Sequence, residues 1–399
     1  MKKLAIVTTH PVQYNVPWIT RLAQRDITIK VFYTYEQSSS GNVYDSGFGK
    51  DIKWDIPLLD GYDYEFVPNT AKKPGLERFM GIVNPSLIRK IEDWDPDQVL
   101  VIGWNYHSHL KVMRHFNRRV PIYFRGDSVL LHEKTGWRKL ARRLFLTWVY
   151  RHIDYVFYVG ANNKSYFLRH GVRREQLVFS PQAIDLDRFS QPDEVYKKQA
   201  EQWKKDLGIP AGNLTVLFAG KMIKVKNPAF LVDLAKATRD LPISFVMVGD
   251  GVLRDEVRDL ATETPNILFV DFQNQSVMPS VYRIGDVYIM PSLSETWGMG
   301  INEAMACGVP VMASDQVGCA VDLVLENKTG MTFGLNEVEK CTAFLRHLKE
   351  DPEHLAEMGN CASALIQFFS FSHIVESVHR TMATAVVEPR RRYLLSAAL

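Results

Sequence analysis

Short apolar segments of strand length alternate with amphipathic segments of helix length along most of this 399-residue chain. In the first half, the strand-like segments are 4–8, 29–33, 98–103, 121–124 and 155–159. A helix-like pattern at 16–24 follows the first of them. Strands that alternate with helices form parallel sheets covered by helices. The first half is therefore predicted to be a doubly wound α/β domain.

The alternation begins again after a charged, helix-prone stretch at 194–207. The strand-like segments of the second half are 214–219, 243–248, 267–270, 287–290 and 309–313. Ligands bind beyond the carboxyl ends of the strands in open parallel sheets. We therefore predict two Rossmann-like α/β domains that face each other across a ligand-binding cleft.

We assign residues 1–190 to an N-terminal domain and residues 210–375 to a C-terminal domain, with the boundary at 188–212. Residues 376–399 are expected to form a tail that crosses back to the first domain. Segment 38–64 interrupts the strand–helix pattern and is rich in Gly, Ser, Asp and aromatic residues. It is predicted to be a long functional loop or a small insertion.

Composition and charge are those of an ordinary globular protein, with 46% hydrophobic residues, 23% charged residues and a net charge of +3. This near-balance gives no case for a nucleic-acid partner. The four cysteines form no C-x-x-C pair, which favours reduced thiols and a cytoplasmic location. No apolar stretch reaches the roughly 18 residues of a membrane span, so none is predicted.

Segment 291–310 carries the strongest chemical signal. A strand ends near Met290, a turn contains Glu295, and a helix begins near Gly298. Gly298 and Gly300 allow a ligand to approach the backbone closely, and the free N–H groups and dipole of a helix start favour phosphate. Glu303 lies about one turn inside the helix, where its carboxylate can accept hydrogen bonds from sugar hydroxyls.

This segment resembles the Glu-x7-Glu motif of the group 1 retaining glycosyltransferases (sequence family 4, GT-B architecture). The shared features are the spacing from Glu295 to Glu303, the glycine–aromatic turn between them, and the Ala-x-Ala-Cys-Gly-x-Pro-Val that follows. The resemblance covers residues 160–335 well and the N-terminal half more loosely. It implies that Glu295 faces the donor sugar as a catalytic residue and that Glu303 holds the nucleotide ribose. The alternative is an ordinary strand–helix unit with two surface acids.

A lysine-rich turn after the strand at 214–219 supports the same resemblance to the group 1 glycosyltransferases. The family usually has Gly-Arg here and Lys-Gly several residues later, and this chain has Gly220-Lys221 and Lys226-Asn227. Two cations at a strand end can neutralise a departing diphosphate, although lysine lacks the bidentate fork of arginine. The alternative is a set of solvated surface lysines. We assign to the donor site Gly220, Lys221, Lys226, Phe272, Trp297, Gly298, Met299, Gly300 and Glu303.

Family members place the acceptor in the N-terminal half. The Thr-His-Pro-x-Gln-Tyr segment after the first strand resembles a bacterial subset of the family, which makes His10 and Gln13 candidates for contact with the acceptor or the donor phosphate. A rigid polar turn explains them equally well. His107 and His109 follow Gly103 at a helix start, and His107 is our acceptor candidate; the alternative is a surface or core histidine.

Another strand of the first half ends at Arg125-Gly-Asp127. Many relatives have a histidine at about position 125, close to the reacting sugar, and this chain departs from them there. Arg125 or Asp127 is expected to take over part of that catalytic role, and the sequence does not decide between them.

Two aspartate patterns raise the question of a metal, because single-domain glycosyltransferases hold a divalent ion with Asp-x-Asp. Asp185-x-Asp187 falls at the exit from the first domain, and Asp93-x-Asp95-x-Asp97 precedes a strand and fits a turn. Lysines and a helix start already supply positive charge. We therefore expect no metal and no cofactor, with the nucleotide-sugar acting as a substrate.

Segment 137–151 is basic and aromatic at helical spacing. It predicts a peripheral contact with the inner face of a membrane, because a helix of this kind can lie in the lipid interface. The residues expected to face anionic lipid are Arg138, Lys139, Arg142 and Arg143, and those expected to enter it are Trp137, Leu144 and Trp148. The alternative is a core helix with a solvated basic face. The basic–apolar run at 390–395 adds to the prediction.

The expected function is retaining transfer of a hexose-type sugar from a nucleotide-sugar donor to a glycan or lipid-linked acceptor, in cell-surface polysaccharide synthesis. Two alternatives stay open. A nucleotide-sugar 2-epimerase shares the two-domain architecture and needs no acceptor. A non-catalytic nucleotide-sugar-binding protein would keep the site without the chemistry.

Overall fold

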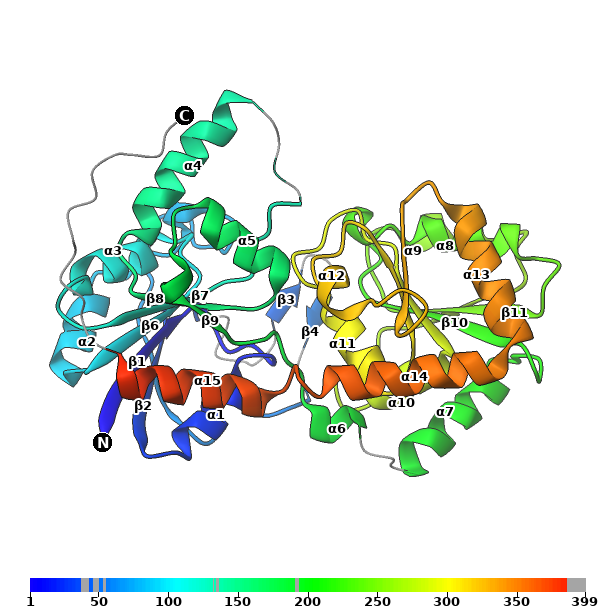
Figure 1. Ribbon diagram of the computed structural model, residues 1–399, viewed down its shortest axis with the longest axis horizontal. Coiled ribbons are helices and arrows are strands. Elements are labelled where there is room, and N and C mark those ends of the chain that lie inside the picture. Colours follow the sequence, from blue (N-terminus) through cyan, green and yellow to red (C-terminus); the bar gives the residue numbers. More distant parts are fainter. Residues whose placement is uncertain are drawn as a thin grey trace.

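The computed structural model describes residues 1–36, 43–45, 50–52, 55–131, 133, 136–190 and 194–385, with the backbone alone in 43–45 and 50–52. Two α/β domains lie side by side, each with a central sheet between layers of helices (Figure 1). This arrangement confirms the predicted fold class.

The first domain is built on a seven-stranded parallel sheet. Its strand order is β5 (Asp63–Phe66), β2 (Ile27–Tyr33), β1 (Lys2–Thr8), β6 (Gln98–Ile102), β7 (Ile122–Arg125), β8 (Tyr155–Tyr158) and β9 (Leu177–Phe179). Its helices are α1 (Val16–Ala23), η1 (Phe79–Gly81), α2 (Leu87–Trp94), α3 (His107–Phe116), α4 (Trp137–Tyr150), α5 (Ala161–Arg169) and η2 (Arg174–Gln176). The central strands are buried on both faces, which explains why they read as continuous apolar runs.

The second domain repeats this plan with a six-stranded parallel sheet. Its strand order is β12 (Ile267–Val270), β11 (Ile243–Val248), β10 (Leu214–Ala219), β13 (Val287–Met290), β14 (Val311–Ser314) and β15 (Gly330–Phe333). The helices from the domain linker onward are α6 (Leu186–Ser190), α7 (Glu194–Asp206), η3 (Lys224–Lys226), α8 (Ala229–Ala237), α9 (Arg254–Leu260), α10 (Met278–Ile284), α11 (Met299–Ala306), α12 (Ala320–Leu323), α13 (Val338–Glu350) and α14 (Pro352–Ile366).

The chain returns to the first domain at its C-terminal end. After α14, residue Ser370 pairs with Ile184 of the linker, and α15 (Phe371–Thr384) then packs along α1 (Figure 1). Lys2 Nζ donates to the Met382 carbonyl at 2.7 Å, and Gln98 Nε2 donates to the same carbonyl at 3.0 Å. The last helix is therefore part of the first domain's outer layer, while residues 386–399, including the basic run at 390–395, lie outside the described residues.

The segment expected to be a long loop or insertion, 38–64, is described in part. It contains a short antiparallel pair, β3 (Val43–Asp45) and β4 (Lys50–Ile52), and the start of β5; residues 38–42, 46–49 and 53–54 lie outside the described residues. Among the described residues, no helix has both the length and the apolar character needed to cross a bilayer. All four cysteines are free thiols, as expected.

Candidate donor site at the domain interface

The turn between β13 and α11 carries the two glutamates, and its backbone requires glycine. Gly298, which caps α11, has φ of 108°, and a Cβ there would lie 2.9 Å from Val317 Cγ1 and 3.0 Å from Met290 Sδ. A Cβ on Gly300 would lie 2.3 Å from the Tyr288 hydroxyl. The N-terminus of α11 therefore starts in close contact with β13, at the carboxyl end of the second sheet.

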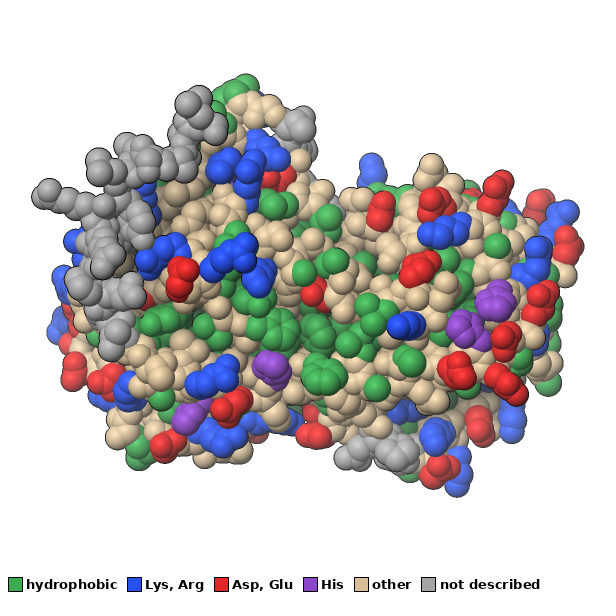
Figure 2. Space-filling model, in the orientation of Figure 1, with side chains coloured by type: hydrophobic (Ala, Val, Ile, Leu, Met, Phe, Trp, Pro, Cys, Tyr) green, Lys and Arg blue, Asp and Glu red, His purple; other side chains and the backbone are tan. Residues whose placement is uncertain are grey.

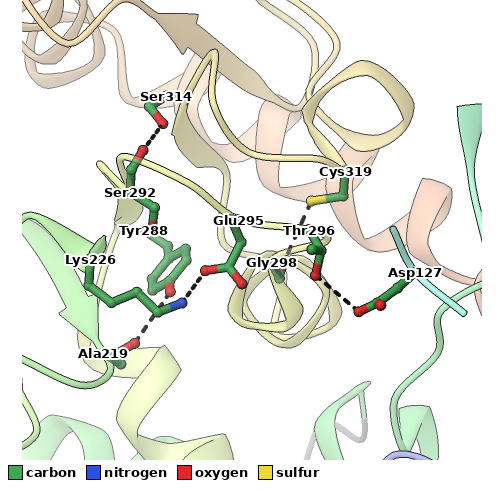
Figure 3. A network of polar contacts seen from close by, with 10 residues as sticks. All are labelled: Asp127, Ala219, Lys226, Tyr288, Ser292, Glu295, Thr296, Gly298, Ser314 and Cys319. Atoms are coloured by element: carbon green, nitrogen blue, oxygen red, sulfur yellow. Dashed lines mark hydrogen bonds and ion pairs between the residues drawn. The ribbon is translucent and has the colours of Figure 1, made fainter. Parts of the chain in front are cut away.

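Glu295 forms an ion pair with Lys226 across this turn (Figure 3). The backbone N–H of Glu295 donates to the Gln316 carbonyl at 3.2 Å, which holds the turn against the loop after β14. Lys226 ends η3, in the turn that follows β10. Glu295 and Lys226 side chains remain 21% and 24% exposed, so a ligand in the interface can reach both charges.

Glu303 lies deeper, on α11, with its side chain buried. Its Oε2 accepts a hydrogen bond from the Tyr282 hydroxyl at 2.6 Å, and its Oε1 accepts one from the Tyr14 hydroxyl at 3.3 Å. Burial raises the pKa of Glu303, and the hydrogen bond from Tyr282 and the nearby Arg188 guanidinium oppose that shift. Tyr14 comes from the first domain, so this carboxylate links the two halves of the molecule.

The other predicted donor residues on the β10 and β12 turns lie at the same sheet edge. Gly220 and Lys221 directly follow β10, and the Gly220 N–H donates to the Val248 carbonyl at 3.0 Å. Phe272 follows β12 and, like Lys221, is partly buried. Because the carboxyl ends of adjacent parallel strands meet at one edge, these residues share that edge with Lys226.

The side chains of two further predicted donor residues, Trp297 and Met299, lie in apolar surroundings. Trp297 is 3% exposed, donates from Nε1 to Asn302 Oδ1 at 2.8 Å, and lies 6.0 Å from the Phe369 ring between centroids. A Cβ on Gly160 would lie 2.4 Å from the same indole, so Trp297 packs against the first domain. Met299 is partly buried beside this apolar cluster. Both side chains support the domain interface by packing.

Arg125, at the end of β7, is 4% exposed and fully engaged in hydrogen bonds. Its Nη1 donates to the Ser180 carbonyl at 2.8 Å and to Ser180 Oγ at 3.0 Å, and its Nη2 donates to the Pro181 carbonyl at 2.8 Å and Gln182 Oε1 at 3.2 Å. Burial lowers the pKa of Arg125 to about 10, and the Asp127 carboxylate opposes this shift. The guanidinium therefore fixes the segment that leads out of the first domain.

Asp127 lies two residues beyond Arg125 and has an exposed side chain. Its Oδ2 accepts a hydrogen bond from Thr296 Oγ1 at 3.0 Å, next to Glu295 (Figure 3). Of the two residues predicted to take the catalytic role in the first domain, Arg125 and Asp127, the structure brings Asp127 next to the turn that carries Glu295.

The predicted acceptor residues are His10, Gln13 and His107, all of them partly buried. His10 Nδ1 and Thr9 Oγ1 are 3.0 Å apart, and burial lowers the pKa of His10. Gln13 directly precedes Tyr14, the residue that reaches Glu303. His10 and Gln13 are therefore in the loop that approaches the second domain.

The two histidines after Gly103 differ in their surroundings. His109 is buried between Thr34 Oγ1 and the Gly103 carbonyl, each 2.8 Å from a ring nitrogen. Burial lowers the pKa of His109 to about 4, so this ring is a neutral core group. His107 packs edge-on against Phe79, with 6.2 Å between centroids, and its buried Nδ1 has no hydrogen-bond partner among the described residues.

Aspartates of the two Asp-x-Asp patterns pair with basic or backbone groups. Asp185 and Asp187 pair with Arg21, at 3.8 Å and 2.8 Å. Asp97 Oδ2 accepts from the Lys3 N–H at 2.7 Å, which closes the turn before β6. Within the ranges that the structure describes, no group of three His, Cys, Asp or Glu side chains is arranged to hold a metal ion.

Comparison with protein families identifies the domain that holds this site. Residues 199–364 match the family described as "Glycosyl transferases group 1", and the match includes Lys226, Glu295 and Glu303. The second domain is a group 1 glycosyltransferase domain.

Curated relatives resemble this domain and its flanks. The D-inositol 3-phosphate glycosyltransferase of Gordonia bronchialis is 29% identical over 201 residues, which cover 47% of this chain and 43% of the relative. The sulfoquinovosyl transferase of Arabidopsis thaliana is 32% identical over 265 residues, or 65% of this chain and 47% of the relative. Each match spans about half the length of the curated relative or less.

Solved structures extend the resemblance to both domains. Anabaena Alr3699/HepE in complex with UDP and glucose superposes with a TM-score of 0.71 at 19% identity, covering 96% of this chain and 100% of that one. Sucrose-phosphate synthase from Thermosynechococcus elongatus gives a TM-score of 0.70 at 18% identity, covering 96% and 98%. The glycosyltransferase domain is therefore the second half of a complete GT-B fold.

Sequence reasoning missed the tyrosines of the group 1 glycosyltransferase site. Tyr14 and Tyr282 both donate to Glu303, and Asn302 Nδ2 donates to the Gln182 carbonyl at 2.9 Å. Tyr14 belongs to the Thr-His-Pro-x-Gln-Tyr segment, whose resemblance to a subset of the family could have marked Tyr14 as a site residue. Tyr282 lies on α10, whose apolar pattern gives no sign that its hydroxyl meets a carboxylate.

Proposed function

We propose that this protein is a retaining glycosyltransferase that moves a hexose-type sugar from a nucleotide-sugar to a glycan or lipid-linked acceptor, in cell-surface polysaccharide synthesis. The observation that carries this proposal is the Lys226–Glu295 ion pair beside the turn that leads into α11, with Glu303 about one turn further along the same helix. A cation, a helix N-terminus and two carboxylates at one edge of a sheet suit a ligand that joins a diphosphate to hydroxyl-rich groups.

The donor lies across the carboxyl edge of the second sheet. Its diphosphate meets Lys226, Lys221 and the start of α11, where charge and dipole stabilise the developing negative charge of the leaving group. Its ribose hydroxyls hydrogen bond to Glu303 in place of Tyr14, whose bond at 3.3 Å is the weaker of the two tyrosine bonds. No metal or cofactor takes part in this scheme.

Binding of the diphosphate changes the partner of Lys226. In the structure its ammonium pairs with Glu295. A phosphate that approaches Lys226 competes with this carboxylate, and Glu295 is then able to turn toward the donor sugar and orient its hydroxyls. The leaving phosphate takes the proton of the acceptor hydroxyl on the same face of the sugar, which retains the configuration at the anomeric carbon.

The acceptor enters from the first domain. The loop containing His10 and Gln13 and the exposed carboxylate of Asp127 both face the second domain, through Tyr14 and Thr296 respectively. Asp127 is the group placed to hold the acceptor hydroxyl near Glu295. Arg125 acts indirectly, because its hydrogen bonds to residues 180–182 position the segment between the domains.

The experiment that tests the function is a turnover assay with purified full-length protein and UDP-, GDP- and dTDP-sugars, each with and without a mixed glycan and lipid-phosphate acceptor pool. The UDP-sugars come first, because Anabaena Alr3699/HepE has been crystallised with UDP and glucose. Acceptor-dependent release of nucleoside diphosphate, with a glycosylated product, is the expected result. Conversion of the donor into a new nucleotide-sugar without acceptor indicates an epimerase instead. A thermal shift with no product from any donor indicates a non-catalytic binder.

A further inference from the structure

Helix α4 projects from the first domain by its N-terminal end (Figure 1). Its buried side chains, Leu146, Val149 and Tyr150, all lie in the second half of the helix and attach it to the domain core. The first turns, from Trp137 onward, extend beyond that attachment and are exposed. A segment of this length that is held at one end presents nearly all of its surface to the surroundings.

The projecting part of α4 is unusually apolar for exposed surface. Its exposed large apolar side chains, with their exposed fractions, are Trp137 (76%), Leu140 (60%), Leu144 (65%), Phe145 (42%) and Trp148 (36%). At about 100° per residue, Trp137, Leu140, Leu144 and Trp148 fall on the face of the helix opposite Leu146. Phe145 lies to one side of that face, with its ring 5.7 Å from the Trp104 ring between centroids. We call the first four the α4 stripe. An apolar stripe that points away from the core it could pack on indicates a surface that contacts something else.

The four cations of α4 lie on the polar side of the helix, away from the α4 stripe. By helical spacing, Arg138 and Arg143 border the stripe on its two sides, and Lys139 and Arg142 lie nearly opposite to it. The α4 sequence contains no acidic residue. Lys139 pairs with Glu133 at 3.2 Å, and Arg138 lies over the Trp137 ring at 5.6 Å. The basic side chains that gather on the upper part of the molecule are visible in Figure 2.

We propose that α4 docks on the surface of an anionic lipid bilayer, with the α4 stripe in the interface and the bordering cations Arg138 and Arg143 on the headgroups. Apolar and tryptophan side chains flanked by lysine and arginine are the chemistry that such an interface takes up. Positive charge beside an apolar stripe adds attraction to an anionic surface. A second copy of this chain is a poorer occupant, because its α4 would bring the same four cations and no acidic residue to pair with them.

The position of α4 connects this surface with the cleft. The chain runs from the end of β7, where Asp127 meets Thr296, to the projecting end of α4 at Trp137. In a strand–helix unit the helix N-terminus lies at the carboxyl edge of the strand, which is the edge that faces the cleft. Docking through α4 therefore brings the acceptor side of the cleft toward the bilayer. This consequence rests on the proposed function, whereas the docking itself does not.

The test is flotation of the full-length protein with phosphatidylcholine vesicles, with and without phosphatidylglycerol, in the absence of any nucleotide-sugar. The wild type is expected to float with the anionic vesicles, to remain mostly unbound with the neutral ones, and to lose binding at about 1 M salt. The double variants L140D/L144D and R138E/R143E are each expected to reduce anionic binding by roughly tenfold or more. The matched control is Val252→Asp, which places the same charge on a side chain 74% exposed in the second domain.

The outcomes separate this proposal from its rivals. A wild type that does not float, or an L140D/L144D variant that floats as well as the wild type, overturns it. Light scattering that shows a dimer dissolved by L140D/L144D also overturns it, in favour of self-association. Thermal shift with UDP-glucose, measured on every variant, reports the donor site separately, so failure of docking and failure of the proposed transferase activity give different results.

Discussion

The charged side chains at the cleft edges of the two domains differ in exposure and in the number of hydrogen bonds that hold them. In the second domain, Glu295 and Lys226 neutralise each other with about a fifth to a quarter of each side chain exposed. In the first domain, Arg125 is 4% exposed and holds four acceptors of the linker. The Lys226 pair can exchange its partner for a substrate, whereas the Arg125 network would lose structure by doing so.

This difference indicates which charged residues can contact a substrate and which ones hold the structure in place. A partly exposed ion pair costs little to open, because solvent and a bound phosphate both replace the lost interaction. A buried guanidinium is costly to leave unpaired, so its hydrogen bonds persist through the reaction. We therefore expect variants of the second-domain edge to change turnover at unchanged stability, and variants of Arg125 to do the reverse.

The largest effect is expected for Glu295→Gln. The amide keeps the shape of the side chain but removes the charge that we propose orients the donor sugar, so kcat should fall by about 10²–10⁴-fold. The melting temperature should change little, because the side chain is partly exposed. Steady-state turnover and differential scanning fluorimetry measure the two quantities. Glu357→Gln, an exposed position on α14, is the matched control and should behave as wild type. Near-native turnover in Glu295→Gln would remove this residue from the mechanism.

Arg125→Ala comes next and should act on stability. Removing the guanidinium leaves the Ser180 and Pro181 carbonyls without their donor, which costs roughly 2–4 kcal/mol of unfolding free energy. Urea unfolding measures this loss. Turnover per folded molecule, assayed below the transition, should fall far less than in Glu295→Gln. If Arg125→Ala instead keeps its stability and loses turnover, Arg125 contacts the reacting groups and the contrast between the two edges is wrong.

The third prediction compares two lysines of one short helix. Lys226→Ala should weaken binding of a nucleoside diphosphate by roughly 10–100-fold, because a charge-assisted phosphate contact contributes about 1.5–3 kcal/mol. Lys224 is exposed on the same η3 turn, so Lys224→Ala removes the same charge away from Glu295. Isothermal titration calorimetry with UDP compares them. Equal losses in both variants would mean that general positive charge, and not the pair with Glu295, recruits the donor.

The fold and the donor edge follow closely from the sequence, for a physical reason. Alternation of apolar strands and amphipathic helices fixes a parallel sheet, and this prediction was confirmed in both domains. Glu295, Gly298 and Glu303 belong to one strand–helix turn, so the chain itself brings them together. Lys226 follows the neighbouring strand β10, and adjacent parallel strands end at one edge. Local connectivity thus determines this part of the site.

Contacts between distant segments could not be predicted in this way. Nothing in the residue pattern indicated that Arg125 would hydrogen bond to residues 180–182. The Thr-His-Pro-x-Gln-Tyr segment marked a candidate loop, but it did not indicate that its Tyr14 would reach Glu303 in the other domain. Trp297 was predicted to bind the donor, and the structure shows its ring packed against Gly160 and Phe369. The surroundings of each side chain depend on how two domains pack, and a periodic pattern within one element carries no information about that packing.

The smallest predicted effect concerns the buried carboxyl of the second domain. Burial raises the pKa of Glu303 above its ordinary value of 4.5 in the folded chain. A folded state with the higher pKa binds the proton more tightly, so this group's contribution to stability is complete below pH 4.5 and is lost as pH rises through the folded pKa. The Glu303→Gln variant has no ionisable group at this position, so it serves as the reference. The stability of the wild type relative to Glu303→Gln should therefore decline as the pH rises above 4.5, which urea unfolding at several pH values measures. A difference that stays flat, or that grows with pH, would mean that Tyr14 and Tyr282 hold Glu303 fully ionised. In that case hydrogen bonds would stabilise the charge of Glu303 as fully as Lys226 stabilises that of Glu295. The two glutamates would then differ only in how deeply they are buried.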